Sequence, residues 1–123
     1  MSRPVTPALC SRYHEAVELI GRRWAGAIIY VLMNGRTRYA TLREAIPGIT
    51  DRMLSERLRE LEEAGIVERH VTPEIPVRVE YGLSKKGREL EKSIKSISDW
   101  ASQWIELPEM EPESTPRARR KTS

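Results

Sequence analysis

Arginine and glutamate side chains recur at helical spacing in the middle of this 123-residue chain. They are the side chains best suited to bind a partner through charge and hydrogen bonds. At about 100° per residue, Arg52, Glu56 and Arg59 fall on one side of a helix. On that side Arg52 is suited to donate to guanine or to a phosphate, with Ser55 and Glu56 beside it at base edges. The alternative is a solvated face held by two i,i+4 ion pairs, Arg52–Glu56 and Arg59–Glu63.

The same segment, residues 50–64, also carries an apolar face. Leu54, Leu58 and Leu61 fall on one narrow stripe opposite the charged side, so we expect them to face a hydrophobic core. Thr50 is suited to cap the helix, which leaves its first turn free to approach phosphate. The segment is therefore predicted to be a helix that buries leucines and presents charge outward.

The order of elements around this helix predicts a known DNA-binding architecture. A shorter helix is expected at residues 41–46, capped by Thr41 and ended by Pro47, because proline disfavours helix at the residue before it. After the long helix, apolar and polar residues alternate in residues 66–71 and 77–83, as in the two strands of a hairpin. Helix, tight turn, helix and hairpin is the order of a winged helix-turn-helix, whose second helix enters the major groove of DNA.

The loop between the two predicted strands is stiffened by Pro73 and Pro76, which prevent further strand pairing there. Arg78 lies just past the loop tip, where it can reach a minor groove or its phosphates. It can also serve as a partner for Glu68 or Glu74. With the helix-turn-helix included, the predicted DNA-contacting residues are Arg38, Thr41, Thr50, Asp51, Arg52, Met53, Ser55, Glu56, Arg59 and Arg78.

Two further helices are expected before the helix-turn-helix, at residues 11–20 and 24–33, and the second is apolar enough to be the centre of the core. A last helix is expected from residue 84 to about residue 105. Its apolar residues form a heptad seam, which a monomer can bury against its own first helix or a dimer against a second copy. DNA-reading helix-turn-helix proteins usually bind two half-sites, which favours a homodimer. The predicted dimer interface comprises Tyr13, Val17, Leu90, Ile94, Ile97, Trp100, Ala101 and Trp104.

The composition limits the classes of protein to which the chain can belong. The net charge of +3 and pI of about 9.2 are compatible with nucleic acid, but such values are also common in proteins that never bind it. No stretch approaches the roughly 18–20 apolar residues of a membrane span, and the N-terminus lacks the apolar core of a secretion signal. A single cysteine cannot form an internal disulfide, which favours a reducing compartment. We therefore expect a cytoplasmic protein without a membrane partner.

One domain is expected, at residues 9–105, between two less ordered ends. Residues 1–8 contain two prolines and are predicted to form a flexible arm. Residues 106–123 are first acidic and then basic, contain three prolines and show no apolar period, so they are predicted to form a disordered charged tail. The basic end of this tail is either solvated or in contact with DNA phosphates.

The sequence contains no constellation typical of catalysis or metal binding. His14 and His70 are far apart, and neither has a cysteine or carboxylate cluster at metal-ligand spacing. There is no glycine-rich phosphate loop and no nucleophile motif. We therefore expect neither an enzyme nor a metal or cofactor site. Four aromatic residues either line an effector pocket between the first and last helices or belong to the core; they are Tyr13, Trp24, Trp100 and Trp104.

Four segments give the chain a resemblance to a known family. They are Cys10, AVELIGRRW at residues 16–24, RYATLREAIPGITDRMLSERLRELEEAGIVER at residues 38–69 and PEIPVRVEYGLSKKGREL at residues 73–90. Over about residues 9–104 the chain resembles the HxlR-type winged-helix transcriptional regulators of the MarR-like superfamily. The resemblance implies an α+β, mainly helical fold, in which a winged helix-turn-helix carries N- and C-terminal dimerisation helices.

Members of this family are dimeric DNA-binding repressors or activators without enzymatic activity. The resemblance implies a recognition helix at residues 50–64, a wing at residues 72–79, and double-stranded DNA and a second copy of the chain as partners. We expect a repressor. The family often has Gly-Gly-Lys-Trp where this chain has residues 21–24, and commonly has proline where this chain has Ser11.

Cys10 is a candidate sensor of oxidants or thiol-reactive small molecules, because some members of the family use a cysteine at this position in that way. It lies at a predicted helix N-terminus with Arg12 close by, and both features favour the reactive thiolate. The alternative is a small apolar residue that packs the first helix.

Two functions of different classes remain open. The first is a sequence-specific DNA-binding regulator that acts as a homodimer and answers to a thiol-reactive or other small-molecule effector. The second is a winged-helix dimer that binds other proteins and does not read DNA. The outward Arg52 and Arg59, with Arg78 at the wing, favour the first.

Overall fold

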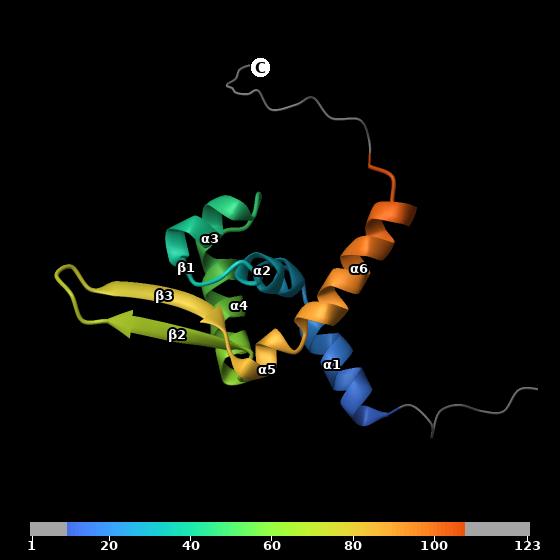
Figure 1. Ribbon diagram of the computed structural model, residues 1–123, viewed down its shortest axis with the longest axis horizontal. Helices are drawn as coiled ribbons and strands as arrows, with labels where there is room; N and C mark the ends of the chain where they lie inside the picture. The colour runs from blue at the N-terminus through green and yellow to red at the C-terminus, as the bar shows by residue number, and fades with distance from the viewer. Residues whose placement is uncertain (1–9, 108–123) are drawn as a thin grey trace, which may run out of the picture.

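The structure, a computed structural model, describes residues 10–107 of the chain. These residues form an α+β, mainly helical fold, which confirms the predicted fold class (Figure 1). In chain order the elements are α1 (Ser11–Gly21), α2 (Ala25–Leu32), β1 (Thr37–Arg38), α3 (Tyr39–Ala45), α4 (Asp51–Glu63), β2 (Val67–Thr72), β3 (Arg78–Leu83), α5 (Lys85–Arg88) and α6 (Glu91–Trp104). The arm predicted at residues 1–8 lies outside the described residues, as does the predicted tail from residue 108 onward.

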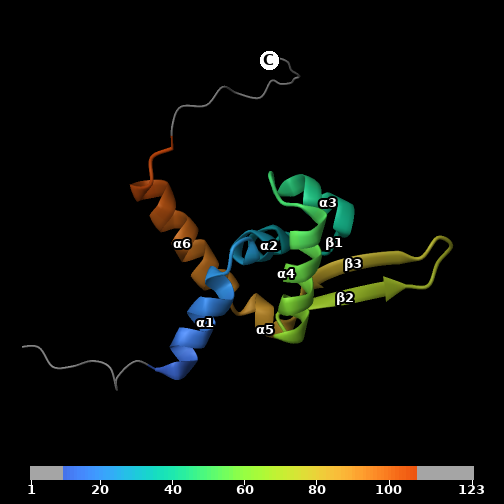
Figure 2. The same ribbon diagram turned by 180° about the vertical axis from the view of Figure 1, so that it is seen from behind.

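The elements divide into two sides around α2. The β2–β3 hairpin projects to one side as a wing, whereas α1 and α6 lie on the other side (Figures 1 and 2). Helix α2 contacts both groups, since it packs against α1, α3, α4, α6 and β3. Within residues 10–107, none of the helices is both long enough and apolar enough to cross a membrane.

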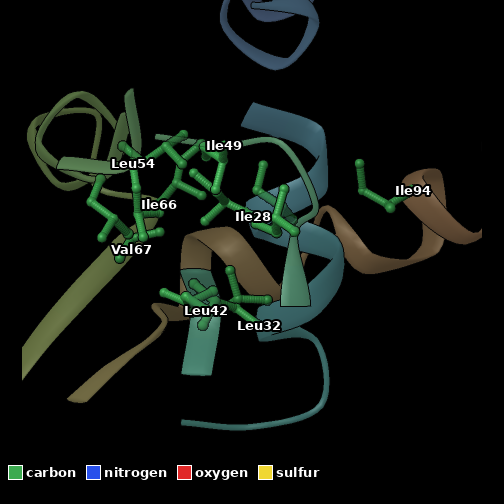
Figure 3. Packing of buried hydrophobic residues seen from close by; sticks show 13 residues of the cluster. Ile28, Leu32, Leu42, Ile49, Leu54, Ile66, Val67 and Ile94 are labelled. Carbon is green, nitrogen blue, oxygen red and sulfur yellow. The ribbon is translucent and has the colours of Figure 1, made fainter. Parts of the chain in front are cut away.

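The hydrophobic core is built on α2, as its apolar sequence predicted. Ile28, Ile29 and Leu32 of this helix are almost completely buried, and Leu42 of α3 packs with them. The leucines of α4 and the first residues of the wing complete the cluster (Figure 3). The wing and the helix-turn-helix therefore share one core, which holds their relative positions.

Both ends of α4 are defined by local hydrogen bonds. The hydroxyl of Thr50 accepts from the backbone N–H of Met53 at 3.1 Å, which confirms the predicted N-cap. At the other end Gly65 adopts φ +79°, and the N–H of Ile66 donates to the carbonyl of Leu61 at 2.9 Å. This is the bonding pattern of a Schellman motif, which needs a residue tolerant of positive φ. The helix therefore stops where the wing has to begin.

The sheet has one strand more than the predicted hairpin. Its order is β1-β3-β2, and all neighbours are antiparallel. In β1, Thr37 pairs with Tyr81 and Arg38 with Glu80. Two residues are too short to show a period of two, so the sequence pattern could not reveal this strand. It anchors the base of the wing to the start of the helix-turn-helix.

The prediction that Thr41 caps the first helix of the helix-turn-helix is wrong. Helix α3 begins at Tyr39, and its N-cap is Arg38, whose side chain makes no capping hydrogen bond. Because β1 runs directly into α3, the N-cap falls at Arg38, three residues before the predicted cap. Thr41 is therefore an exposed residue within the helix.

The predicted single helix from residue 84 to about residue 105 is also wrong, because it is divided into α5 and α6. Ser84 caps α5 by accepting from the N–H of Gly87 at 3.0 Å. The N–H of Leu90 then donates to the carbonyl of Gly87 at 3.0 Å, a tight turn that ends α5. A Cβ at position 87 would collide with the carbonyl oxygen of Ile66, so glycine is needed for α5 to lie against the wing.

Candidate nucleic-acid interface

Helix α4 presents the two faces predicted from its sequence. Leu54, Leu58 and Leu61 are buried, whereas the side chain of Arg52 is 85% exposed. Arg52 Nε lies 3.2 Å from Glu56 Oε2, so the first of the two expected ion pairs is present. Among the described residues no ion pair joins Arg59 to Glu63, and Arg59 is exposed. The outward face therefore carries one paired and one free guanidinium.

Two helices are joined at the start of α4 by a hydrogen-bonded cluster, which we call the α3–α4 clasp. It consists of Tyr39 and Arg43 of α3 with Asp51 and Ser55 of α4. Arg43 Nη1 lies 2.9 and 3.1 Å from the two carboxylate oxygens of Asp51. The Tyr39 hydroxyl lies 3.0 Å from the Asp51 carbonyl oxygen and 3.0 Å from Ser55 Oγ.

The clasp includes two residues predicted to contact DNA, Asp51 and Ser55, and both have partners in α3. The Asp51 carboxylate is engaged by Arg43 and so joins α4 to α3, whereas Ser55 stays exposed. Contact of either residue with DNA stays a prediction. Tyr39 and Arg43 were missed, because no helical periodicity links residues on opposite sides of the Pro47–Gly48 turn.

Arg57 is a second residue that sequence reasoning missed. Its side chain is only 11% exposed, and its Nε donates to the carbonyl of Arg23 at 2.8 Å. Its Nη1 also pairs with Glu60 at 3.3 Å. Arg57 thus ties α4 to the connection between α1 and α2. A partner 34 positions away leaves no signal in the spacing of the sequence.

The wing carries Arg78 at the start of β3. Arg78 Nη2 lies 2.9 Å from Glu74 Oε2, so the ion pair that was weighed as the alternative role of Arg78 is present. The pair is partly exposed at the wing, and such pairs contribute only about 0–1 kcal/mol. A DNA phosphate can therefore replace Glu74 as the partner of the Arg78 guanidinium at a small cost in free energy.

Four other residues predicted to contact DNA differ in how far they are exposed to solvent. Thr50 caps α4, and Met53 is half-buried against the core. Arg38 and Thr41 are exposed at the start of α3. Of this group, only Arg38 offers a charged side chain to the solvent.

The apolar face of the terminal helices is largely uncovered in the protomer. No residue of α1 is buried, and Tyr13 and Val17 are exposed. In α6, Trp100 is 58% and Trp104 66% exposed. Ile97 is exposed as well, whereas Leu90 and Ala101 are half-buried.

Ile94 was predicted to lie in the dimer interface, but it is only 7% exposed in the protomer. It belongs to the hydrophobic core of the protomer, where α6 meets α2 (Figure 3). Its side chain is thus already covered before any second copy binds.

An aromatic effector pocket was one of two alternatives for the four aromatic residues, and none of the larger cavities in residues 10–107 corresponds to it. A cavity of about 740 Å³ lies between α1, the end of α4 and Leu90, but none of the four aromatic residues lines it. Trp24 instead packs on Gly48, 3.6 Å from the position of a Cβ there. Cys10 is exposed and precedes α1, without a capping hydrogen bond from its side chain.

The two histidines do not form a metal centre with their neighbours. His70 Nε2 lies 3.4 Å from Glu68 Oε1 on the wing. In the described part of the chain, no group of three or more histidine, cysteine, aspartate or glutamate side chains is arranged to hold a metal ion.

The sequence of these elements is similar to that of known transcriptional regulators. The family model of the HxlR-like helix-turn-helix proteins matches residues 19–109. The HTH-type transcriptional regulator YvaP of Bacillus subtilis is 44% identical over 98 residues, which are 80% of this chain and 91% of that protein. YodB, an HTH-type transcriptional regulator of the same organism, is 46% identical over 98 residues, which are 80% of this chain and 88% of that protein.

Solved structures share the fold as well as the sequence. The reduced form of the B. subtilis regulator YodB aligns with a TM-score of 0.72 and 46% identity, over 80% of this chain and 96% of that one. The redox regulator HypR in its oxidised form aligns with a TM-score of 0.74 and 35% identity, over 78% and 99%. YodB has also been solved after diamide treatment and with bound quinone.

Proposed function

The chain belongs to the HxlR-like helix-turn-helix family, and we propose that it regulates transcription as a homodimer that binds a specific DNA sequence. The observation that carries the proposal is the outward face of α4, where Arg52 and Arg59 are exposed above a buried leucine stripe. Arginine is the residue most often used to read guanine in the major groove. The wing, with Arg78 next to its loop, projects from the same domain and is expected to reach the neighbouring groove (Figure 1).

The homodimer part of the proposal is supported by the terminal helices. Trp100 and Trp104 expose most of their area to solvent, as do Ile97 and Tyr13, and Val17 is 45% exposed. Exposed apolar surface of this kind marks interaction sites. A second copy covers this face with the same residues, and it brings a second α4 to the DNA so that two half-sites are bound.

We assign the dimer the role of a repressor. Helices α1 and α6 supply its apolar pairing face, while α4 and the wing supply its DNA-facing surface. Occupation of a promoter is the simplest action open to such a molecule. A reporter gene under the bound promoter should therefore be more active when the regulator is deleted, and a loss of activity would indicate an activator.

Replacing Arg52 by alanine is expected to weaken specific DNA binding by about 1–3 kcal/mol. The side chain is exposed, and its pair with Glu56 is a surface pair that a base can displace. Binding is measured by fluorescence anisotropy on the DNA upstream of the protein's own gene and adjacent genes, in the presence of competitor DNA.

The matched control for this experiment is Lys92→Ala. It removes one positive charge from the solvent side of α6, away from α4 and the wing, and it should leave specific binding unchanged. If Arg52→Ala binds like the unmodified protein, the role of Arg52 is refuted. If all three proteins bind every sequence alike with steep salt dependence, or none of them binds DNA, specific reading of DNA is refuted. A winged-helix dimer that binds proteins would then be the better assignment.

A signal through Cys10 is the second part of the proposal. The thiol is exposed next to α1, which carries part of the proposed dimer face. YodB has been solved in a reduced form and after diamide treatment, and the redox regulator HypR in oxidised and reduced forms, which supports a similar response here. A change at Cys10 would alter how the two copies pair and thus how two recognition helices meet the DNA.

Diamide oxidises two thiols to a disulfide and is itself reduced to the hydrazine, so in this protein it is expected to join Cys10 of one copy to Cys10 of the second copy. This bond is expected to reduce the DNA affinity of the protein by roughly 5- to 150-fold, the usual range of coupling between sites. Dithiothreitol should restore it. Cys10→Ser should bind DNA with the normal affinity, and diamide should not change that affinity, because the chain has no other cysteine. An equal loss of DNA binding in the Cys10→Ser variant would show that Cys10 is not the sensor.

A further inference from the structure

The α3–α4 clasp contains a hydrogen-bond chain whose direction can be worked out from its members. The Tyr39 hydroxyl lies 3.0 Å from the Asp51 carbonyl oxygen and 3.3 Å from Asp51 Oδ1. The same hydroxyl lies 3.0 Å from Ser55 Oγ. Ser55 is exposed, so the end of this chain faces the solvent.

A tyrosine hydroxyl has one proton to donate and can also accept. A peptide carbonyl oxygen only accepts, and so does a carboxylate oxygen. The contact between Tyr39 and Asp51 is therefore a hydrogen bond only if Tyr39 supplies the proton. That leaves the contact at Ser55 without a proton from Tyr39, so the hydroxyl of Ser55 must donate to the tyrosine oxygen. In this arrangement the tyrosine proton goes to the nearer Asp51 carbonyl oxygen, with Asp51 Oδ1 beside it at 3.3 Å, and the serine proton goes to the tyrosine oxygen. The opposite direction, with Tyr39 donating to Ser55, would leave the tyrosine oxygen 3.0 Å from a carbonyl oxygen with no proton between them.

Arg43 holds Asp51 in place at the acceptor end of the chain. Its guanidinium lies against both carboxylate oxygens of Asp51 and so pairs with the ionised carboxylate, which has no proton to donate to Tyr39. The single proton of Ser55 is then used internally. What Ser55 turns to the solvent is an oxygen with free acceptor capacity and no proton to give.

Ser55 lies close to the proposed DNA-reading face. At 100° per residue, Arg59 is only about 40° further around the helix from Ser55. In the major groove the hydrogen-bond donors are the amino groups of adenine and cytosine, whereas guanine and thymine present keto oxygens. A hydroxyl that can only accept forms a hydrogen bond with an amino group, and it is repelled by a keto oxygen or a phosphate oxygen.

We propose that Tyr39 fixes Ser55 as a hydrogen-bond acceptor, so that the protein selects adenine or cytosine over guanine or thymine at one position of each half-site. The proposal rests on the proposed function, since it describes how the same helix reads DNA. Tyr39 is a positioning residue in this account, and Ser55 is the residue that touches the base.

Selection from a randomised DNA pool tests the proposal with the full-length protein and three variants. The unmodified protein should enrich sites with one strand-specific position where amino bases are preferred by roughly threefold to tenfold, the effect of one hydrogen bond. Tyr39→Phe should still select the same flanking bases but lose this preference, because Ser55 can then also donate. Ser55→Ala should lose it too. Tyr30→Phe is the control, because Tyr30 is exposed on α2 and makes no side-chain hydrogen bond to any described residue; it should retain the preference.

A base analogue keeps the test valid even if Tyr39→Phe folds poorly. Purine lacks the amino group of adenine, and pyrimidin-2-one lacks that of cytosine. Placed at the selected position, the analogue should weaken binding of the unmodified protein by roughly threefold to tenfold and leave binding of Ser55→Ala unchanged. Equal losses in both proteins would overturn the role of Ser55.

The outcomes also separate this inference from the proposed function. If the unmodified protein enriches a defined site but no position loses its amino preference in Tyr39→Phe or Ser55→Ala, the inference fails and the regulator stands. If the unmodified protein enriches no site at all, both fail together.

Discussion

Replacing Trp100 by glutamate is expected to raise the dissociation constant of the proposed dimer at least about 30-fold, because buried interface tryptophans commonly contribute 2 kcal/mol or more. Trp100 is 58% exposed on the protomer and lies on the apolar face shared with Ile97 and Trp104. Covering an unpaired carboxylate there adds a desolvation cost to the lost contact area. DNA affinity should fall with dimerisation, because a monomer binds only one half-site.

Sedimentation equilibrium over a range of protein concentrations measures the effect. Val71→Glu is the control, since Val71 is also about half exposed but lies on the wing, on the side of the molecule away from α1 and α6 (Figure 1). The control should remain dimeric. An unchanged dissociation constant for Trp100→Glu, in a variant with a normal melting temperature, would show that this face is not the dimer interface.

Replacing Gly87 by alanine is expected to destabilise the fold by about 2–3 kcal/mol, the upper part of the range of about 1–3 kcal/mol found for overpacked sites. The added Cβ collides with the carbonyl oxygen of Ile66. That oxygen already accepts the N–H of Ser84 at 3.0 Å, so it cannot move without weakening the junction between wing and α5. The melting temperature should fall by roughly 10 °C or more for a domain of this size.

Gly21→Ala is the matched control for this substitution. Gly21 ends α1, its φ is not positive, and a Cβ there meets nothing within 4 Å. Alanine is a better helix former than glycine, so this variant should melt at the same temperature or slightly higher. Thermal unfolding followed by circular dichroism compares the two at equal concentration. Equal melting temperatures would mean that α5 can shift away from Ile66 freely.

The long helix was predictable from the sequence because its signals are local. Thr50 caps a backbone N–H three residues away, and Gly65 closes the last turn. The buried Leu54 and Leu58 are four residues apart, which is one turn of the helix. Each of these features depends on residues within about one turn, so the spacing alone reveals it.

The features that the sequence did not reveal depend on partners from other elements. Strand β1 exists because Thr37 and Arg38 pair with β3, more than 40 positions further along the chain. Ile94 follows the heptad seam like its neighbours, yet packing against α2 removes it from the exposed face. Periodicity gives the side of a helix on which a residue lies, but it does not say which neighbour covers that side.

The sequence by itself determined that an amphipathic helix with outward arginines and glutamates precedes a two-stranded wing, because those properties follow from spacings of three, four and two residues. Only the tertiary structure decided which of the polar groups remain available. Asp51 is held by Arg43 from 8 positions away, Ser55 by Tyr39 from 16, and the Arg23 carbonyl accepts from α4 across 34. Hydrogen bonds of this kind form only once the core has brought separate helices together, so no local pattern records them.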